Sequence, residues 1–246
     1  MNYLVCISKT PDTTAKISFK SEDTEYNSDG ISFIMNPYDE WYALVRALEL
    51  SEQNGGTVTV IHVGPSSNDI IIRKALAIGA TDAVRINLES TDAFLTASNI
   101  ANYAKSKSFD IIFLGKETID YNGSEVGAMI SELLDLPFVS YASKLIVNGS
   151  KSLVSRDIEG GIEVCEIEGP FVLSAAKGLA EQRIPNMKGI MMAKSKPLEV
   201  IEPTLISSRI KIKKFIVPHG KTGVKLVDPE NMDELVRLLH EEARVI

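Results

Sequence analysis

Apolar and polar residues follow two alternating patterns between residues 3 and 137. In one, a short run is almost wholly apolar, which is typical of a strand buried on both faces of a parallel sheet. In the other, apolar residues recur every three or four positions, which indicates a helix with one buried face. Such alternation predicts an α/β fold, an open, mostly parallel twisted sheet with helices on both faces. The expected strands are 3–7, 57–63, 83–86 and 110–114, and the expected helices are 39–53, 68–78, 92–105 and 124–135.

The pattern changes after residue 143, where short extended runs are separated by Asn148-Gly149 and Gly160-Gly161. These dipeptides favour the tight turns of β-hairpins. We therefore expect antiparallel hairpin strands added at the edge of the parallel sheet. The expected strands are 144–147, 153–158 and 162–167, with a further core strand at 171–175.

Two later segments lack a clear period. Residues 177–196 are rich in Lys, Gly and Met, and a loop of that length in a compact domain is either functional or disordered. Residues 201–246 contain few apolar positions before a final helix expected at 228–242. We therefore divide the chain into an α/β nucleotide-binding domain, residues 1–200, and a C-terminal arm, residues 201–246, that packs on another chain or back over this one.

A polar loop separates the strand expected at 110–114 from the helix expected at 124–135. In open α/β sheets, a loop between the carboxyl end of a strand and the start of a helix attracts anions, because the first N–H groups of the helix are free and the helix dipole is positive there. The loop is a candidate phosphate site, although it is neither a P-loop nor a dinucleotide fingerprint. The alternative is an ordinary strand–helix loop capped by Ser124.

Composition narrows the possible partners. The net charge of −7 argues against nucleic acid, whose phosphates require clustered Lys and Arg. No apolar run reaches the ~18 residues of a membrane span, and the first residues lack the features of a signal peptide, so we expect a cytoplasmic protein without membrane insertion. Cys6 and Cys165 are expected to be buried, reduced thiols. We expect neither a catalytic residue nor a metal site, because nucleophile and metal-ligand spacings are missing.

Seven pieces of sequence occur in a characteristic order along nearly the whole chain: LVCISKTPDTTAKI, MNPYDEWYALVRALEL, VTVIHVGP, IRKALAIGATDAVRI, FLGKETIDYNGSEVGAMISELLDLP, RDIEGGIEVCEIEGP and IPNMKGIMMAKSKPLEVI. Together they resemble the beta subunit of electron-transfer flavoprotein. The resemblance implies a heterodimer with an alpha subunit, on which residues 201–246 would pack. It also implies an electron carrier rather than an enzyme, with FAD held mainly by the alpha subunit and electron bifurcation left open.

The resemblance also implies a nucleotide site in this subunit, with AMP favoured over a second FAD. The backbone amides of Gly123, Ser124, Glu125 and Val126 would hold the phosphate, and Asp120 would anchor the polar network. Glu125 and Val126 replace a Gln and a Thr of the family pattern, which removes two donors and adds a negative charge. The implied site residues are Cys6, Asn36, Pro37, Tyr38, Asp39, Val63, Gly115, Lys116, Glu117, Thr118, Ile119, Asp120, Tyr121, Asn122, Gly123, Ser124, Glu125 and Val126.

Two further positions follow from the resemblance. Tyr38 would lie near the flavin ring held by the alpha subunit, and Ile184-Pro185-Asn186 would contact the flavin-containing dehydrogenases that donate electrons. The alternatives are a nucleotide-binding regulatory module like the universal stress proteins and an ATP-using adenylating amidotransferase. The first ends before the hairpins and the tail at 201–246, and the second needs an early phosphate loop that Ser8 to Asp12 do not provide.

Overall fold

The computed structural model describes residues 1–90, 92–218, 220 and 223–246. The chain forms two compact units. The first comprises Met1–Ser18 and Asn27–Lys211, and the second comprises Phe19–Tyr26 and Ile212–Ile246. The boundary predicted between residues 200 and 201 stays a prediction.

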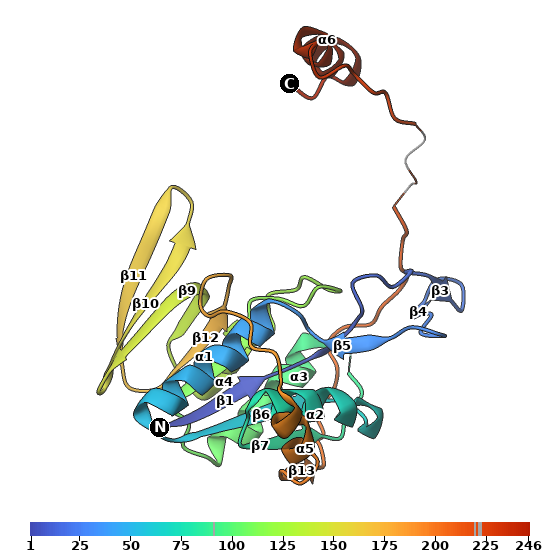
Figure 1. The fold of residues 1–246 in the computed structure, drawn as a ribbon. Coiled ribbons are helices and arrows are strands. Elements are labelled where there is room, and N and C mark those ends of the chain that lie inside the picture. Colours follow the sequence, from blue (N-terminus) through green and yellow to red (C-terminus); the bar gives the residue numbers. More distant parts are fainter. Residues whose placement is uncertain (91, 219, 221–222) are drawn as a thin grey trace. The chain divides into compact units, whose positions relative to one another are not determined.

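A nine-stranded sheet forms the first unit, in the order β11-β10-β9-β12-β8-β1-β6-β7-β13. Every neighbouring pair from β9 to β13 in this order is parallel, whereas β10 runs antiparallel to both β9 and β11. The prediction of a mostly parallel sheet with antiparallel hairpin strands at its edge is confirmed (Figure 1). The strands are β1 (Asn2–Cys6), β6 (Thr57–Val63), β7 (Asp82–Ile86), β8 (Ile111–Gly115), β9 (Phe138–Asn148), β10 (Lys151–Ile158), β11 (Gly161–Glu168), β12 (Phe171–Ala175) and β13 (Leu198–Ile201).

Helices cover both faces of the sheet because successive strand residues point to opposite sides. Tyr3 and Val5 of β1 pack in one apolar core with helices α1 and α2, and Leu4 and Cys6 pack in a second core with α3 and α4. This double burial explains why β1, β8 and β12 are almost wholly apolar. The helices are α1 (Asp39–Asn54), α2 (Asp69–Ile78), α3 (Ala93–Lys105) and α4 (Val126–Leu134), and a single 3₁₀ turn, η1 (Ser66–Asn68), precedes α2.

Two short elements depart from the sequence expectation. The stretch 177–196, expected to be a loop, contains the helix α5 (Met187–Ala193), and β13 pairs in parallel with β7 at the sheet edge opposite the hairpins. Both elements are too short to show a period. Outside the large sheet, β2 (Lys9–Pro11) pairs with β5 (Phe33–Met35).

The residues after β13 first follow helix α3 within the first unit. Asp92 caps α3 by accepting hydrogen bonds from the N–H groups of Phe94 and Leu95 at 2.8 and 3.3 Å. Its second carboxylate oxygen accepts from the N–H of Arg209 at 2.7 Å, and the Asn99 side chain accepts from the N–H of Thr204 at 2.8 Å. The segment expected to be the start of an arm is therefore bound to the helix surface as far as residue 209.

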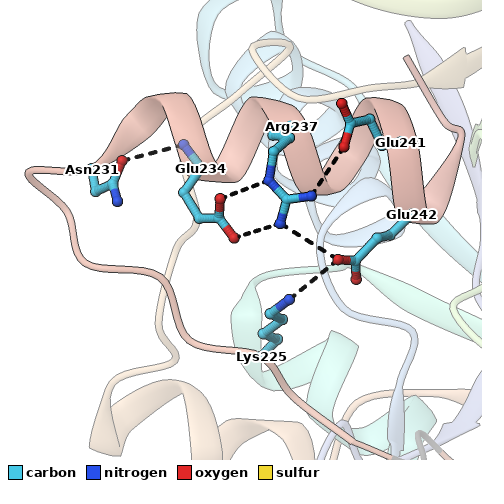
Figure 2. Close-up of polar contacts among 6 residues, drawn as sticks. All are labelled: Lys225, Asn231, Glu234, Arg237, Glu241 and Glu242. Atoms are coloured by element: carbon cyan, nitrogen blue, oxygen red, sulfur yellow. Dashed lines mark hydrogen bonds and ion pairs between the residues drawn. The ribbon is translucent and has the colours of Figure 1, made fainter.

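The second unit joins a small hairpin, β3 (Phe19–Lys20) and β4 (Glu25–Tyr26), to the C-terminal segment. The rings of Phe19 and Phe215 stack with their centroids 4.5 Å apart. The helix expected at 228–242 is present as α6 (Met232–Arg237) followed by the π-helix η2 (Leu238–Ala243). Figure 2 shows Arg237 between Glu234, at 2.8 Å, and Glu241, at 3.0 Å. Arg237 is thus paired within the chain, and Leu238 is buried.

Candidate functional site

The predicted site segments meet at one edge of the sheet. Cys6, Val63 and Gly115 are the last residues of β1, β6 and β8, which are parallel neighbours in the sheet. The carboxyl ends of parallel strands share an edge, where open α/β sheets place their ligands. We call residues 115–126, from the last residue of β8 to the first residue of α4, the carboxyl-edge loop.

Asn36 holds the carboxyl-edge loop from the segment before α1. Its side chain is fully buried, and its amide nitrogen donates to the carbonyl of Glu117 at 3.0 Å. Its amide oxygen accepts from the N–H of Ile119 at 3.1 Å. Both ends of the amide are therefore used to fix loop backbone, and the nucleotide contact predicted for Asn36 stays a prediction.

The N-terminus of α1 lies beside this loop. Pro37 precedes Tyr38, which has a positive φ of 65° and a side chain that is 52% exposed. Asp39 is partly buried, and burial raises the pKa of its carboxyl to about 6, against the opposing effect of Lys116. Tyr38 therefore presents an aromatic ring to solvent at the same edge as the loop.

Glu40 is a buried carboxyl group beside Gly115 that the sequence analysis missed. Its carboxylate is only 6% exposed and accepts from the N–H of Ser8 at 2.7 Å and from the Ser8 hydroxyl at 2.5 Å. Burial raises the pKa of Glu40 to about 8, although the two bonds from Ser8 act in the opposite direction. The spacing of Glu40 could have indicated that it is buried, because it precedes Leu44 by one helical turn on the buried face of α1.

Gly115 allows β8 and α1 to approach closely. A Cβ atom at this position would lie 2.9 Å from both the backbone nitrogen and the Cγ of Glu40. Atoms of this kind do not approach so closely in proteins, so any side chain would displace the start of α1. A glycine at the end of this strand is thus required by the packing of the site.

Within the loop, polar side chains bond to loop groups and leave the start of α4 open. Lys116 pairs with Glu117 at 3.2 Å, and the Ser124 hydroxyl donates to Glu117 at 3.4 Å. Ser124 does not cap α4: the residue before the helix is Glu125, and its side chain caps nothing. The expected cap by Ser124 is therefore wrong, whereas the choice between an ordinary loop and a phosphate site stays a prediction.

The backbone donors at the end of the loop are available. Among the residues that the structure describes, no acceptor pairs with the N–H groups of Gly123, Ser124, Glu125 or Val126. Asn122 and Ser124 have positive φ values of 48° and 53°, so the backbone here is held in a conformation uncommon for residues with side chains. Free donors at the first turn of a helix are the groups that bind phosphate in other α/β proteins.

The remaining loop residues make local contacts. The N–H of Asn122 donates to the carbonyl of Thr118 at 2.9 Å, and Asp120 accepts from the N–H of Tyr121 at 3.0 Å. Asp120 therefore orders its own turn and does not bond to the other predicted site segments. Glu117, Asp120 and Glu125 give the loop three carboxylates against the single ammonium of Lys116. A bound phosphate would depend on backbone donors more than on side-chain charge.

A buried histidine supports the neighbouring strand end. His62 Nδ1 donates to the carbonyl of Ile7 at 2.9 Å, and its Nε2 accepts from the amide of Asn68 at 2.9 Å. This pairing fits the neutral imidazole, and burial lowers the pKa of His62. A Cβ atom on Gly64 would lie 2.4 Å from both side chains, so the turn after Val63 also requires glycine.

Ile184, Pro185 and Asn186 lie elsewhere. They border a hollow of about 300 Å³ beside Gly79, which follows the last residue of α2. Since α2 runs antiparallel to the strands, its end lies at the amino edge of the sheet, opposite the carboxyl-edge loop. Ile184 is 83% exposed, and Asn186 caps α5 by accepting from the N–H of Gly189 at 2.8 Å. We call residues 183–196 the α5 segment.

The fold is that of a doubly wound α/β protein, and the loop after β8 has unpaired N–H groups at the start of α4. A sequence model described as electron transfer flavoprotein domain matches residues 24–206. In the part of the chain that the structure describes, none of the helices has the length and apolarity needed to traverse a lipid bilayer.

Curated relatives of similar length carry a more specific description. The electron transfer flavoprotein subunit beta of Bacillus subtilis is 37% identical over 261 residues, which cover 100% of both chains. The corresponding subunits of Bradyrhizobium diazoefficiens and Homo sapiens are 32% and 30% identical, over 100% of this chain and 100% and 99% of theirs. The chain belongs to the electron-transfer flavoprotein beta-subunit family.

Proposed function

We propose that this chain passes electrons as the beta subunit of a heterodimer with an electron-transfer flavoprotein alpha subunit. Electrons would come from flavin-containing dehydrogenases and leave to a downstream acceptor, in the cytoplasm. Full-length similarity to proteins named as beta subunits supports this role, because a beta subunit has a partner chain and a flavoprotein has a flavin. The chain would act as a carrier, without substrate chemistry of its own.

The FAD would be held mainly by the alpha subunit, and it would supply the one-electron and two-electron chemistry. Tyr38 is the residue of this chain best placed to meet the flavin ring. Its half-exposed side chain projects at the carboxyl edge, where a positive φ and the following helix fix the direction of its backbone. An aromatic ring offers apolar area against a flavin without adding charge.

The carboxyl-edge loop would bind the phosphate of a nucleotide, AMP in preference to a second FAD. The observation that carries this proposal is the set of free N–H groups from Gly123 to Val126 at the start of α4. Asn36 fixes the other half of the loop, at residues 117 and 119, without any ligand. Cys6 and Val63, at the ends of β1 and β6, would line the same edge.

The test is to co-purify the chain with the alpha subunit, denature the heterodimer, and count FAD and AMP per heterodimer. Gly123→Val is the informative variant. A Cβ atom at Gly123 would meet only the Glu125 side chain, at 3.6 Å, so the added bulk opposes the phosphate rather than the fold. Gly161→Val in β11 is the control, because nothing lies within 4 Å of its Cβ position.

We expect one AMP and one FAD in the wild type and in the control, and FAD without AMP in Gly123→Val. Two FAD molecules and no AMP in the wild type would identify the second FAD as the ligand of this subunit. Equal AMP in wild type and Gly123→Val would place the phosphate elsewhere.

Contact with the dehydrogenases would be made by Ile184, with Pro185 and Asn186 shaping the loop. An isoleucine that is 83% exposed is a candidate for insertion into a partner's apolar pocket. Pro185 has no N–H to donate, and Asn186 starts α5, so the backbone on one side of Ile184 is restricted.

A further inference from the structure

Helix α5 is attached to helix α2 by a lysine that lies just beyond it. The ammonium of Lys196 donates to the carbonyls of Leu76, Gly79 and Ala80 at 3.0, 3.3 and 2.5 Å. These carbonyls belong to the last turn of α2 and the residues after it, where carbonyls lack partners within the helix. The three donors of one lysine thus complete the end of α2, where the helix dipole also favours a cation.

The reverse contact is made by an arginine of α2. Arg73 donates from Nη1 to the carbonyls of Ala193 and Lys196, at 2.8 and 2.7 Å. Ala193 is the last residue of α5. The carboxyl end of α5 is therefore bonded by a cation of α2, and the carboxyl end of α2 is bonded by a cation three residues beyond α5.

The two helices also touch through their backbones. A Cβ atom on Gly189 would lie 2.4 Å from the carbonyl oxygen of Ala77, so only glycine permits this contact. Helix α5 has seven residues, and an isolated helix of that length is unstable in water. Its position beside α2 therefore depends on these tertiary contacts (Figure 1).

The other side of Ile184 is fixed as well. The indole nitrogen of Trp41 donates to the carbonyl of Arg183 at 3.1 Å, and the Arg183 guanidinium forms two bonds to Glu52, at 2.6 and 3.0 Å. Ile184 is thus exposed between two anchored points rather than on a free loop.

We infer that Lys196 and Arg73 are positioning residues for partner binding, acting through Ile184. This inference rests on the proposed contact between Ile184 and a dehydrogenase. A side chain presented on a fixed backbone loses less conformational freedom when it binds, so removing either cation should weaken association without changing the electron transfer that follows. Lys194 offers the matched comparison, since its side chain is exposed at the same helix end.

The experiment uses the full-length chain co-expressed with its alpha subunit and a panel of purified flavin dehydrogenases from the same organism, each reduced by its own substrate. The variants are Lys196→Met, Arg73→Met, Lys194→Met and Ile184→Ala. We expect Lys196→Met and Arg73→Met to raise KM for the dehydrogenase about fivefold with kcat unchanged. Lys194→Met, which removes the same charge, should change KM by less than about twofold.

Two further measurements separate positioning from general stability. Amide hydrogen exchange of residues 184–193 should become faster in Lys196→Met, while the melting temperature of the heterodimer stays unchanged. In the Ile184→Ala background, adding Lys196→Met should have no further effect on KM, because the residue through which it acts is already truncated.

The outcomes distinguish the two levels of the proposal. If Ile184→Ala leaves KM unchanged with every dehydrogenase, the proposed contact is wrong. If Ile184→Ala raises KM but Lys196→Met and Arg73→Met do not, or if the effects of Ile184→Ala and Lys196→Met simply add, the contact stands and the positioning role is overturned. A lowered melting temperature with unchanged KM in Lys196→Met and Arg73→Met would likewise show that the two residues stabilise the fold and do not position Ile184.

Discussion

The carboxyl-edge loop and the α5 segment are both fixed by side chains that bond to backbone. They differ in what is left free, which is backbone N–H groups in the loop and an apolar side chain in the α5 segment. In the loop, Asn36 bonds to residues 117 and 119, and the unpaired groups are backbone N–H donors. In the α5 segment, Lys196 and Arg73 close carbonyl groups, and the free group is the apolar side chain of Ile184. The first arrangement suits a small anion, and the second suits a protein surface.

The largest change in stability is expected for Glu40, which lies beside Gly115 at the start of the carboxyl-edge loop. Its folded pKa of about 8 lies above the ordinary 4.5, so the stability it contributes is complete below about pH 4.5 and is lost as pH rises through about 8. Since one pKa unit corresponds to about 1.4 kcal/mol, wild type should lose about 3 kcal/mol relative to Glu40→Gln between about pH 5 and pH 8.

Urea unfolding at a series of pH values measures this difference. Glu132→Gln, at an exposed position of α4, is the control and should show the same pH dependence as wild type. Parallel stability curves for wild type and Glu40→Gln would mean that Glu40 ionises normally in the folded chain.

The next effect concerns the close contact between β8 and α1. Gly115→Ala should lower the free energy of unfolding by about 2 kcal/mol, because its Cβ would overlap the backbone of Glu40. Gly123→Ala, in the same loop, should cost less than about 0.5 kcal/mol, since its Cβ has room. Chemical denaturation of both variants checks the contrast, and equal losses would contradict the distinction between a packed and an open part of the loop.

At the α5 segment, Ile184→Ala should weaken dehydrogenase binding by about 1.5 kcal/mol, the usual cost of truncating an apolar interface anchor. The melting temperature should not change, because the side chain is exposed in the free chain. Ile70→Ala removes an isoleucine of α2 that is 75% exposed and should leave binding unaltered. A lowered melting temperature with normal binding would show that Ile184 packs within the protein.

The smallest effect is expected at Ser124. A serine that caps a helix contributes about 1 kcal/mol, whereas Ser124→Ala should change stability by less than about 0.3 kcal/mol, because its hydroxyl bonds to Glu117 and not to α4. Asp92→Ala, which removes the cap of α3 and also the bonds to Ser208 and Arg209, should lose at least the full contribution of a cap in the same unfolding assay. Comparable losses of unfolding free energy in the two variants would show that Ser124 does cap α4.

The fold was predictable because its signals are local. The apolar strands and amphipathic helices of residues 3–137 lie within a few residues of the expected limits, and the hairpin turns are marked by glycine dipeptides. The edge to which Cys6, Val63 and Gly115 belong follows from parallel strand direction alone. Short elements such as α5 and β13 escaped prediction because contacts with α2 and β7, distant in sequence, determine them.

The meeting of the candidate site segments at one sheet edge was predictable, but the contacts among them were not. Glu40 occupies a position that looks like part of an apolar stripe, and its partner Ser8 lies 32 residues away. Serine is a common helix-capping residue and Ser124 lies just before α4, but its hydroxyl bonds to Glu117 instead of to the helix. The hydrogen bonds of Lys196 are made to residues more than a hundred positions earlier, and no spacing in the sequence indicates them.

The position of β12 has a consequence for synthesis of the chain. This strand lies between β8 and β9, so the hairpin strands join the parallel sheet only through a segment that the ribosome makes later than both neighbours. At about 5–20 residues per second, roughly 3–12 seconds separate the emergence of Gly115 from that of Ala175. During that interval one side of β8 has no partner strand. The nascent chain therefore carries an unpaired, apolar strand edge directly before the carboxyl-edge loop.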